Sequence, residues 1–191
     1  MTAIDIRGVA RVGLLDGYRV QGTTTTLTAV GDSMAPTIPA GSSLLVEFGR
    51  APARIGEVIL FRRGAALIAH RLVARRATGD GLALTPKGDA EPYLDPTISD
   101  EQILGVVRDV CRPDGLTAPA LSRGAAATIA RVSWWCGRAA AVGTRVLRRA
   151  PLAAPIKRVA LRGHLALSRV PTRVAMALIP RLDRGIPAGR R

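Results

Sequence analysis

The sequence predicts a mainly β domain over about residues 23–117 and an α-helical, strongly basic tail over 118–191, after a short lead, 1–22. Short β-branched or alternating runs separated by Gly and Pro fill the first part. The segment PDGLTAPA is typical of a linker, and Ala, Arg, Val and Leu dominate after it. Charge divides at the same place: up to Thr117 there are 13 Lys and Arg against 13 Asp and Glu, and beyond it 15 against Asp183 alone. The net charge of +14 therefore belongs to the tail.

Six strands are expected, enough for a small barrel or coiled sheet. They are residues 25–30, 43–48, 57–62, 66–75, 82–86 and 103–110. Between the first two lies GDSMAPTIPAG, in which Pro36, Pro39 and Gly41 disfavour a continuing strand. We expect a tight turn or a single helical turn that starts near Ser33.

The tail has arginines at helical spacing. Arg131, Arg138 and Arg145 recur every seven residues, which puts them on one helix face with apolar residues around them. A second stripe consists of Arg158, Arg162, Arg169 and Arg173. Gly163 and Pro171 weaken helix formation in that stretch. Two or three amphipathic basic helices are expected.

Neither a secretory leader nor a membrane-spanning helix is evident, because arginines and acids interrupt every apolar run. The two cysteines, Cys111 and Cys136, lack the spacing of a metal site or disulfide framework and are expected to be reduced and partly buried. We expect no metal and no cofactor. The expected location is the cytoplasm or the periphery of a membrane.

Three segments hold candidate catalytic residues. Ser33, in GDSMAP, follows a strand, and a serine becomes a strong nucleophile only beside a base. Alone it is more typical of a helix cap. His70 lies among apolar residues in AHRLV, where a histidine is more often a satisfied core residue. The polar segment PKGDAEPYLDP supplies carboxylates but by itself is typical of a solvated turn.

The ordered set GDSMAPTI, IGEVILF, AHRLV and PKGD, with a second aspartate six residues on, resembles the signal peptidase I family, serine peptidases of family S26. The resemblance covers about residues 25–110. It is closest to the histidine type found in the endoplasmic reticulum and in archaea, because His70 stands where bacterial enzymes have lysine. It implies the coiled β-sheet barrel shared by signal peptidases and LexA, which belong to one superfamily.

The resemblance also implies roles for single residues. Ser33 attacks the scissile carbonyl, His70 is the general base and Asp95 orients the imidazole, with the backbone N–H of Ser33 in the oxyanion hole. Asp89 becomes a structural acid near the site, in a turn with Lys87 and Gly88. Lys87 is the one lysine of the β domain, so a Ser-Lys pair has no other candidate. Substrate is expected to add as a strand beside Leu27, Ala29 and Val30.

The resemblance implies a serine endopeptidase that cuts signal or leader peptides after small residues, in the family's manner. Two alternatives stay open: a catalytically silent module that binds peptides or partners, and a self-cleaving repressor, which needs a DNA-binding module and a lysine base. Departures from the family are the missing anchor ahead of Ser33 and the pair Ala90–Glu91 where two asparagines are common.

The sequence leaves two interpretations of the partner of the basic tail. Helices with an arginine stripe and an apolar face are suited to an anionic membrane surface, through residues 118–191. The other interpretation is a helical appendage that packs on the β domain or on a second copy. Nucleic acid is disfavoured because Trp134 and Trp135 are the only aromatic residues of the tail.

Overall fold

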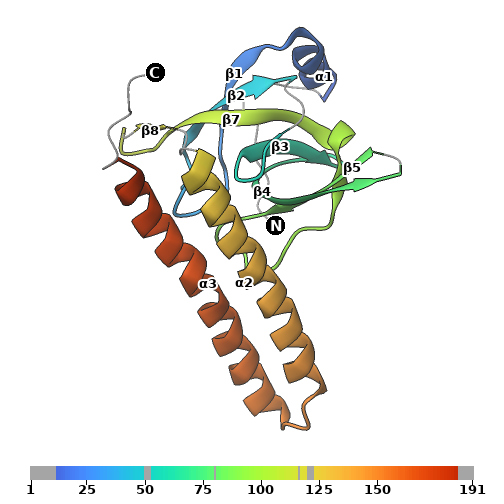
Figure 1. Cartoon of the computed structure of the whole chain (residues 1–191), viewed down its shortest axis with the longest axis vertical. Coiled ribbons are helices and arrows are strands. Elements are labelled where there is room, and N and C mark those ends of the chain that lie inside the picture. Colours follow the sequence, from blue (N-terminus) through green and yellow to red (C-terminus); the bar gives the residue numbers. More distant parts are fainter. Residues whose placement is uncertain (1–11, 50–52, 80, 116, 120–122, 185–191) are drawn as a thin grey trace.

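The computed structural model describes residues 12–49, 53–79, 81–115, 117–119 and 123–184. Its centre is an antiparallel sheet in the order β1-β2-β7-β3-β4-β5-β6, with β8 paired to β7 (Figure 1). The strands are β1 Thr24–Thr28, β2 Ser43–Phe48, β3 Val58–Arg63, β4 Ala66–Thr78, β5 Gly81–Lys87, β6 Ile98–Ser99, β7 Ile103–Cys111 and β8 Thr117–Pro119. The predicted class, mostly β followed by helices, is confirmed at that level.

The six expected strands all form, with ends that differ by a few residues. Two short strands were not expected. β6 has two residues, too few for an alternating pattern, and β8 lies in the segment read as a linker, where Thr117 pairs with Cys111. Both take their conformation from a neighbouring strand rather than from their own sequence.

Two apolar clusters fill the β domain. One includes Leu44, Val46 and Leu104, and the other includes Ile59, Leu72 and Val106. Their members are almost completely buried because alternate residues of β2 and a run of β4 point inward.

Helix α1, Val12–Gln21, packs against β2 and β7. Leu15 is buried in the first cluster, and the Tyr18 ring meets the Phe48 ring edge-on at 5.7 Å. The segment treated as a lead therefore contributes to the core.

The tail forms two long helices, α2 Arg123–Arg149 and α3 Ala154–Arg184, which run side by side as a hairpin beyond the β domain (Figure 1). α3 continues through Gly163 and Pro171, against the expected weakening. Packing explains this, because Thr172 and Met176 are buried just after the proline and the loss of one backbone hydrogen bond is tolerated. No helix in the described ranges is long and apolar enough to cross a membrane.

The two cysteines differ in exposure. Both are free thiols, and Cys136 is half-buried as expected, but Cys111 is exposed. The prediction for Cys111 was wrong because this residue ends β7 on an outward position of the pleat.

Candidate active site

Ser33 lies at the turn that follows β1. The backbone N–H of Ile38 donates to the carbonyl of Met34 at 2.9 Å, and the Ala35–Pro36 peptide bond between them is cis, so a tight hydrogen-bonded turn follows the serine, the first of the two expected forms. Met34 and Ile38 are buried and fix this turn to the apolar cluster behind it. Ser33 itself is buried, at 6 % exposure.

His70 lies in β4 and faces this turn. Its Nε2 is 2.8 Å from the Ser33 Oγ, and its ring meets the Phe61 ring edge-on at 6.3 Å. β4 is an inner strand, paired with β3 and β5, so the backbone around the imidazole is held on both sides. The apolar run around His70 thus buries the ring without removing its polar partner.

Asp95 completes a hydrogen-bonded chain. Its Oδ2 is 2.5 Å from His70 Nδ1, and its backbone N–H donates to the Pro86 carbonyl at the end of β5. Arg63 Nη1 lies 3.4 Å from the other carboxylate oxygen. In the tautomer that carries its proton on Nδ1, His70 donates a hydrogen bond to Asp95, and the unprotonated Nε2 can accept the proton of the Ser33 hydroxyl.

The acid loop, residues 88–95, is tied to the serine turn. The Ala90 N–H donates to the Ser33 carbonyl at 2.8 Å, and the Asp89 N–H contacts the Met34 sulfur at 3.4 Å. A Cβ on Gly88 would lie 2.8 Å from the Ser33 carbonyl oxygen and 3.0 Å from His70 Nε2. Glycine therefore allows this close approach of three segments.

Asp89 forms a buried pair with Arg71. The guanidinium Nε and Nη2 donate to the two carboxylate oxygens at 3.0 and 2.7 Å, and Nη1 donates to the Gly56 carbonyl at 2.8 Å. Asp89 does not contact His70 through a hydrogen bond in the described residues. The structure therefore places Asp95 beside the imidazole and Asp89 beside the Arg71 guanidinium.

Lys87 is buried at the end of β5, 2 % exposed, and its Nζ donates to the Gly88 carbonyl at 3.0 Å. Burial lowers the pKa of Lys87 from its ordinary value, and the nearby Asp89, Cys136, Glu91 and Asp95 partly oppose this effect. His70 occupies the position next to the Ser33 hydroxyl. Lys87 instead contacts the backbone at the start of the acid loop.

Helix α2 supports the acid loop from outside. A Cβ on Gly137 would lie 2.8 Å from the Leu94 side chain, and the Tyr93 hydroxyl is 2.9 Å from the Thr144 Oγ1. At the start of the helix, Ala126 packs directly on Gly56. Helix α2 thus contacts the acid loop next to Asp95 and the turn at Gly56 that precedes β3.

Arg63, Arg71 and Gly137 were missed by the sequence reasoning. Arg71 could have been found, because it adjoins His70 in AHRLV and a buried Asp89 requires a cation. Arg63 and Gly137 give no such signal, since each depends on a contact between distant segments.

The expected substrate strand has mixed exposure. The Leu27 side chain is buried in the core, Ala29 is buried and pairs with the turn at Gly41 and Ser42, and Val30 is 48 % exposed. Among the described strands β1 pairs only with β2 and forms one edge of the sheet. That edge has backbone groups available for another strand.

The arrangement has the geometry of an activated nucleophile. A hydroxyl touches an imidazole, and a carboxylate holds the opposite nitrogen, which is how serine hydrolases generate a nucleophile without a metal.

Comparison with known proteins gives one family. A family model described as Peptidase S24-like matches residues 12–108, about half of the chain. A search of curated proteins found no match. The matched segment runs from α1 into β7 and contains Ser33, His70 and Asp95. The chain belongs to the Peptidase S24-like family, within the superfamily that contains LexA and the signal peptidases.

Proposed function

We propose that this protein is a serine endopeptidase that cuts signal or leader peptides by a Ser33-His70-Asp95 mechanism. The observation that carries the proposal is the continuous hydrogen-bonded chain from the Ser33 hydroxyl through both ring nitrogens of His70 to the Asp95 carboxylate. Membership of a peptidase family supports the reaction class. The resemblance of the motifs to S26 enzymes of the histidine type supports the peptide class and cleavage after small residues.

The reaction follows from the positions of these groups. As the Ser33 Oγ attacks the scissile carbonyl carbon, its proton passes to His70 Nε2, and Asp95 stabilises the imidazolium through Nδ1–H. Collapse of the tetrahedral intermediate expels the amine, which takes the proton from Nε2. Water then attacks the acyl-enzyme with His70 again as base. The Ser33 backbone N–H is the proposed donor to the developing oxyanion. Gly31, two residues earlier, has no side chain that could supply a second donor.

The outer edge of β1, which pairs with no second strand among the described residues, is the proposed place for the peptide backbone. A substrate strand paired there would run toward the Ser33 turn, with main-chain hydrogen bonds supplying affinity. Val30, which is 48 % exposed and lies three residues before Ser33, would contact the residues before the cut.

Cleavage of a peptide library by the purified full chain tests the proposal. We expect cuts after small residues, and a loss of kcat/KM of at least about 1000-fold in Ser33→Ala and in His70→Ala. Ser43→Ala in β2 and His164→Ala in α3 are matched controls, which should retain cleavage. Equal cleavage by all variants would disprove the mechanism, and cleavage with no preference for small residues would disprove the substrate class.

The same experiment addresses self-cleavage, which the family match keeps as a second candidate. The wild-type chain is incubated alone and examined by mass spectrometry. A Ser33-dependent cut within the chain and no cut in added peptides would favour a self-cleaving protein over a peptide-processing enzyme.

A further inference from the structure

The hairpin of α2 and α3 exposes apolar side chains along its length. On α2 these include Trp135, which is 66 % exposed. Val142 and Val146 follow it on the same face of the helix, seven and eleven residues further along the chain, and are also exposed. On α3, Val159 and Leu167 are each 71 % exposed. The α3 residues on this face are Ile156, Val159, Leu167, Val170, Val174 and Leu178. Exposed apolar side chains gathered on one face of each helix are typical of an interaction site.

The buried residues of each helix lie on the opposite side. Ile129, Ala130, Ser133 and Ala140 of α2 are buried, as are Thr172 and Met176 of α3. Gly143 receives the His164 ring, whose Nε2 is 3.1 Å from the Ala140 carbonyl oxygen. The hairpin therefore has its own packed seam, and the exposed apolar faces remain without a partner in the described residues.

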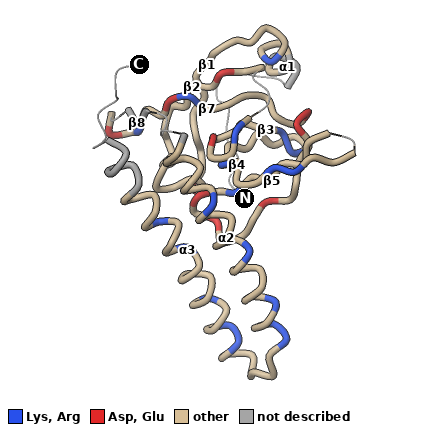
Figure 2. The backbone as a smooth tube through the Cα atoms, in the orientation of Figure 1, with Lys and Arg blue, Asp and Glu red and all other residues tan. Residues whose placement is uncertain are grey.

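Arginines border these faces. Arg131, Arg138 and Arg145 follow one flank of α2, and Arg162 and Arg173 follow one flank of α3. Figure 2 shows that the charged positions toward the tip of the hairpin are all basic. A helix that combines an exposed apolar stripe with a basic flank can bury the stripe at an acyl boundary while the guanidinium groups reach phosphates.

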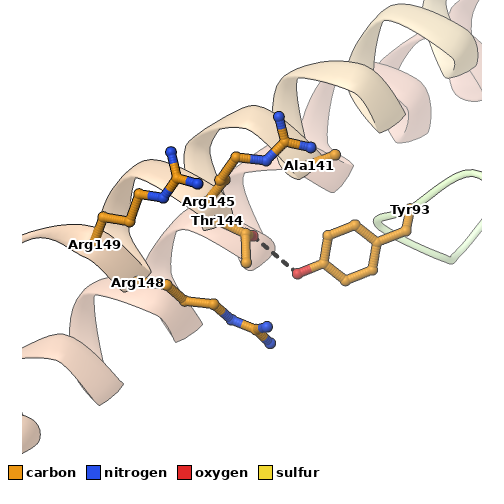
Figure 3. Close-up of a pocket in the computed structure, with 6 residues that line it drawn as sticks. All are labelled: Tyr93, Ala141, Thr144, Arg145, Arg148 and Arg149. Carbon is orange, nitrogen blue, oxygen red and sulfur yellow. Dashed lines mark hydrogen bonds between the residues drawn. The ribbon is translucent and has the colours of Figure 1, made fainter.

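An open pocket of about 430 Å³ lies on the α2 flank, between the helix and the acid loop. Arg145 and Arg148 extend from the helix on either side of the Tyr93–Thr144 hydrogen bond, and Arg149 lies beside them (Figure 3). No described residue places a carboxylate within ion-pair distance of these three side chains. Guanidinium and hydroxyl donors around one opening are suited to a phosphate group.

We propose that the hairpin binds the surface of an anionic bilayer, with its apolar faces at the acyl boundary and its arginines on lipid phosphates, one of them in the pocket at Tyr93. Charge complementarity selects this occupant, because the tail has 15 basic residues and one acid. A second copy of the hairpin would bring like charges together. Nucleic acid would leave the apolar faces in water. Each long helix lies on the membrane, and the β domain is held beside it.

Flotation of the full chain with vesicles tests the proposal. We expect binding to vesicles of phosphatidylcholine mixed with phosphatidylglycerol, weak binding to phosphatidylcholine alone, and weakening by salt. Arg145→Gln/Arg148→Gln/Arg149→Gln should weaken binding about 100-fold. Arg54→Gln/Arg75→Gln/Arg76→Gln removes the same charge from exposed positions of the β domain and should have a smaller effect.

The apolar faces need a separate variant. Val159→Ser/Leu167→Ser/Val170→Ser keeps every charge, and we expect a loss of binding of at least about tenfold. Trp135 is a built-in reporter in Trp134→Phe: its emission should shift to shorter wavelength with anionic vesicles. Circular dichroism verifies that each variant keeps its helices.

Several results would overturn the proposal. These are equal binding to both vesicle types, equal effects of the two arginine triples, or no effect of the serine triple. Tight binding of an oligonucleotide without vesicle binding would assign the tail to nucleic acid. A dimer that the serine triple dissociates would assign the face to a second copy. Peptide cleavage has no part in these measurements, so they stand apart from the proposed catalytic function.

Discussion

The β domain and the hairpin use the same residue type, arginine, in opposite ways. In the β domain Arg71 is buried and forms a two-pronged pair with Asp89, and Arg63 faces Asp95. In the hairpin Arg145, Arg148 and Arg149 border an open pocket. Buried arginines orient neighbours because a lone buried charge is costly, whereas exposed arginines remain available for an outside partner. The difference separates a region built for fixed geometry from one built for contact.

Asp95→Asn is the sharpest test of that fixed geometry. The amide can present its NH₂ to His70 Nδ1, which favours the tautomer that cannot accept the Ser33 proton. We expect kcat/KM to fall by about 10⁴-fold with little change in KM. Steady-state kinetics on the peptide identified by library cleavage gives the answer. An activity near that of the wild type would remove Asp95 from the mechanism.

Arg71→Met tests whether the buried pair stabilises the β domain. Removal of the guanidinium leaves Asp89 buried and without its partner, so we expect a loss of about 3–5 kcal/mol in the free energy of unfolding. Arg108→Met is the matched control. Arg108 pairs with Glu47 and Glu57 near the surface, and its loss should cost at most about 1 kcal/mol. Urea denaturation measures both, and equal losses would contradict the contrast between buried and exposed arginines.

Gly143→Ala and Gly163→Ala test the hairpin's seam. A Cβ on Gly143 would lie 2.2 Å from the His164 ring, so we expect a loss of about 1–3 kcal/mol through overpacking. Gly163 has open space around it, and alanine there should stabilise α3 by up to about 1 kcal/mol. Thermal unfolding followed by circular dichroism compares the two. A gain in stability in both variants would mean that the seam does not depend on the glycine.

Much of the β domain could be predicted because its information is local. The strand containing His70 is an apolar run, and the Ser33 turn is marked by two prolines and a glycine. The grouping of Ser33, His70 and Asp95 came from a resemblance between ordered motifs, and their roles in catalysis stay predictions. Their two hydrogen bonds join residues 37 and 25 positions apart, which periodicity alone does not encode.

What the sequence reasoning missed depends on packing between distant segments. The fit of Leu94 on Gly137 needs both the acid loop and α2 in place, and a glycine inside a helix gives no hint of its partner. β8 forms because β7 offers an edge. Pro171 lies within a helix because the residues after it are buried. In each case tertiary contacts override local propensity.

Lys87 gives the smallest expected effect and lies between the two regions, under the acid loop and close to Cys136 of α2. Burial lowers its pKa below the ordinary 10.5, so between the lowered pKa and 10.5 the unfolded chain binds more protons than the folded one. The free energy of unfolding should therefore rise with pH across that window. Below the lowered pKa the lysine is charged in both states and the cost of burying it is constant.

Lys87→Met removes this dependence, so the difference in unfolding free energy between wild type and variant should change with pH in the window and stay constant below it. Urea denaturation from neutral to alkaline pH measures the difference, with Cys136→Ser in both proteins so that only the lysine differs. Parallel curves over the whole range would mean that Lys87 keeps its proton on folding as easily as in water. A difference that rises with pH across the window would show that folding buries the charged Lys87 at a cost in free energy. The exposed arginines of the hairpin carry no such cost.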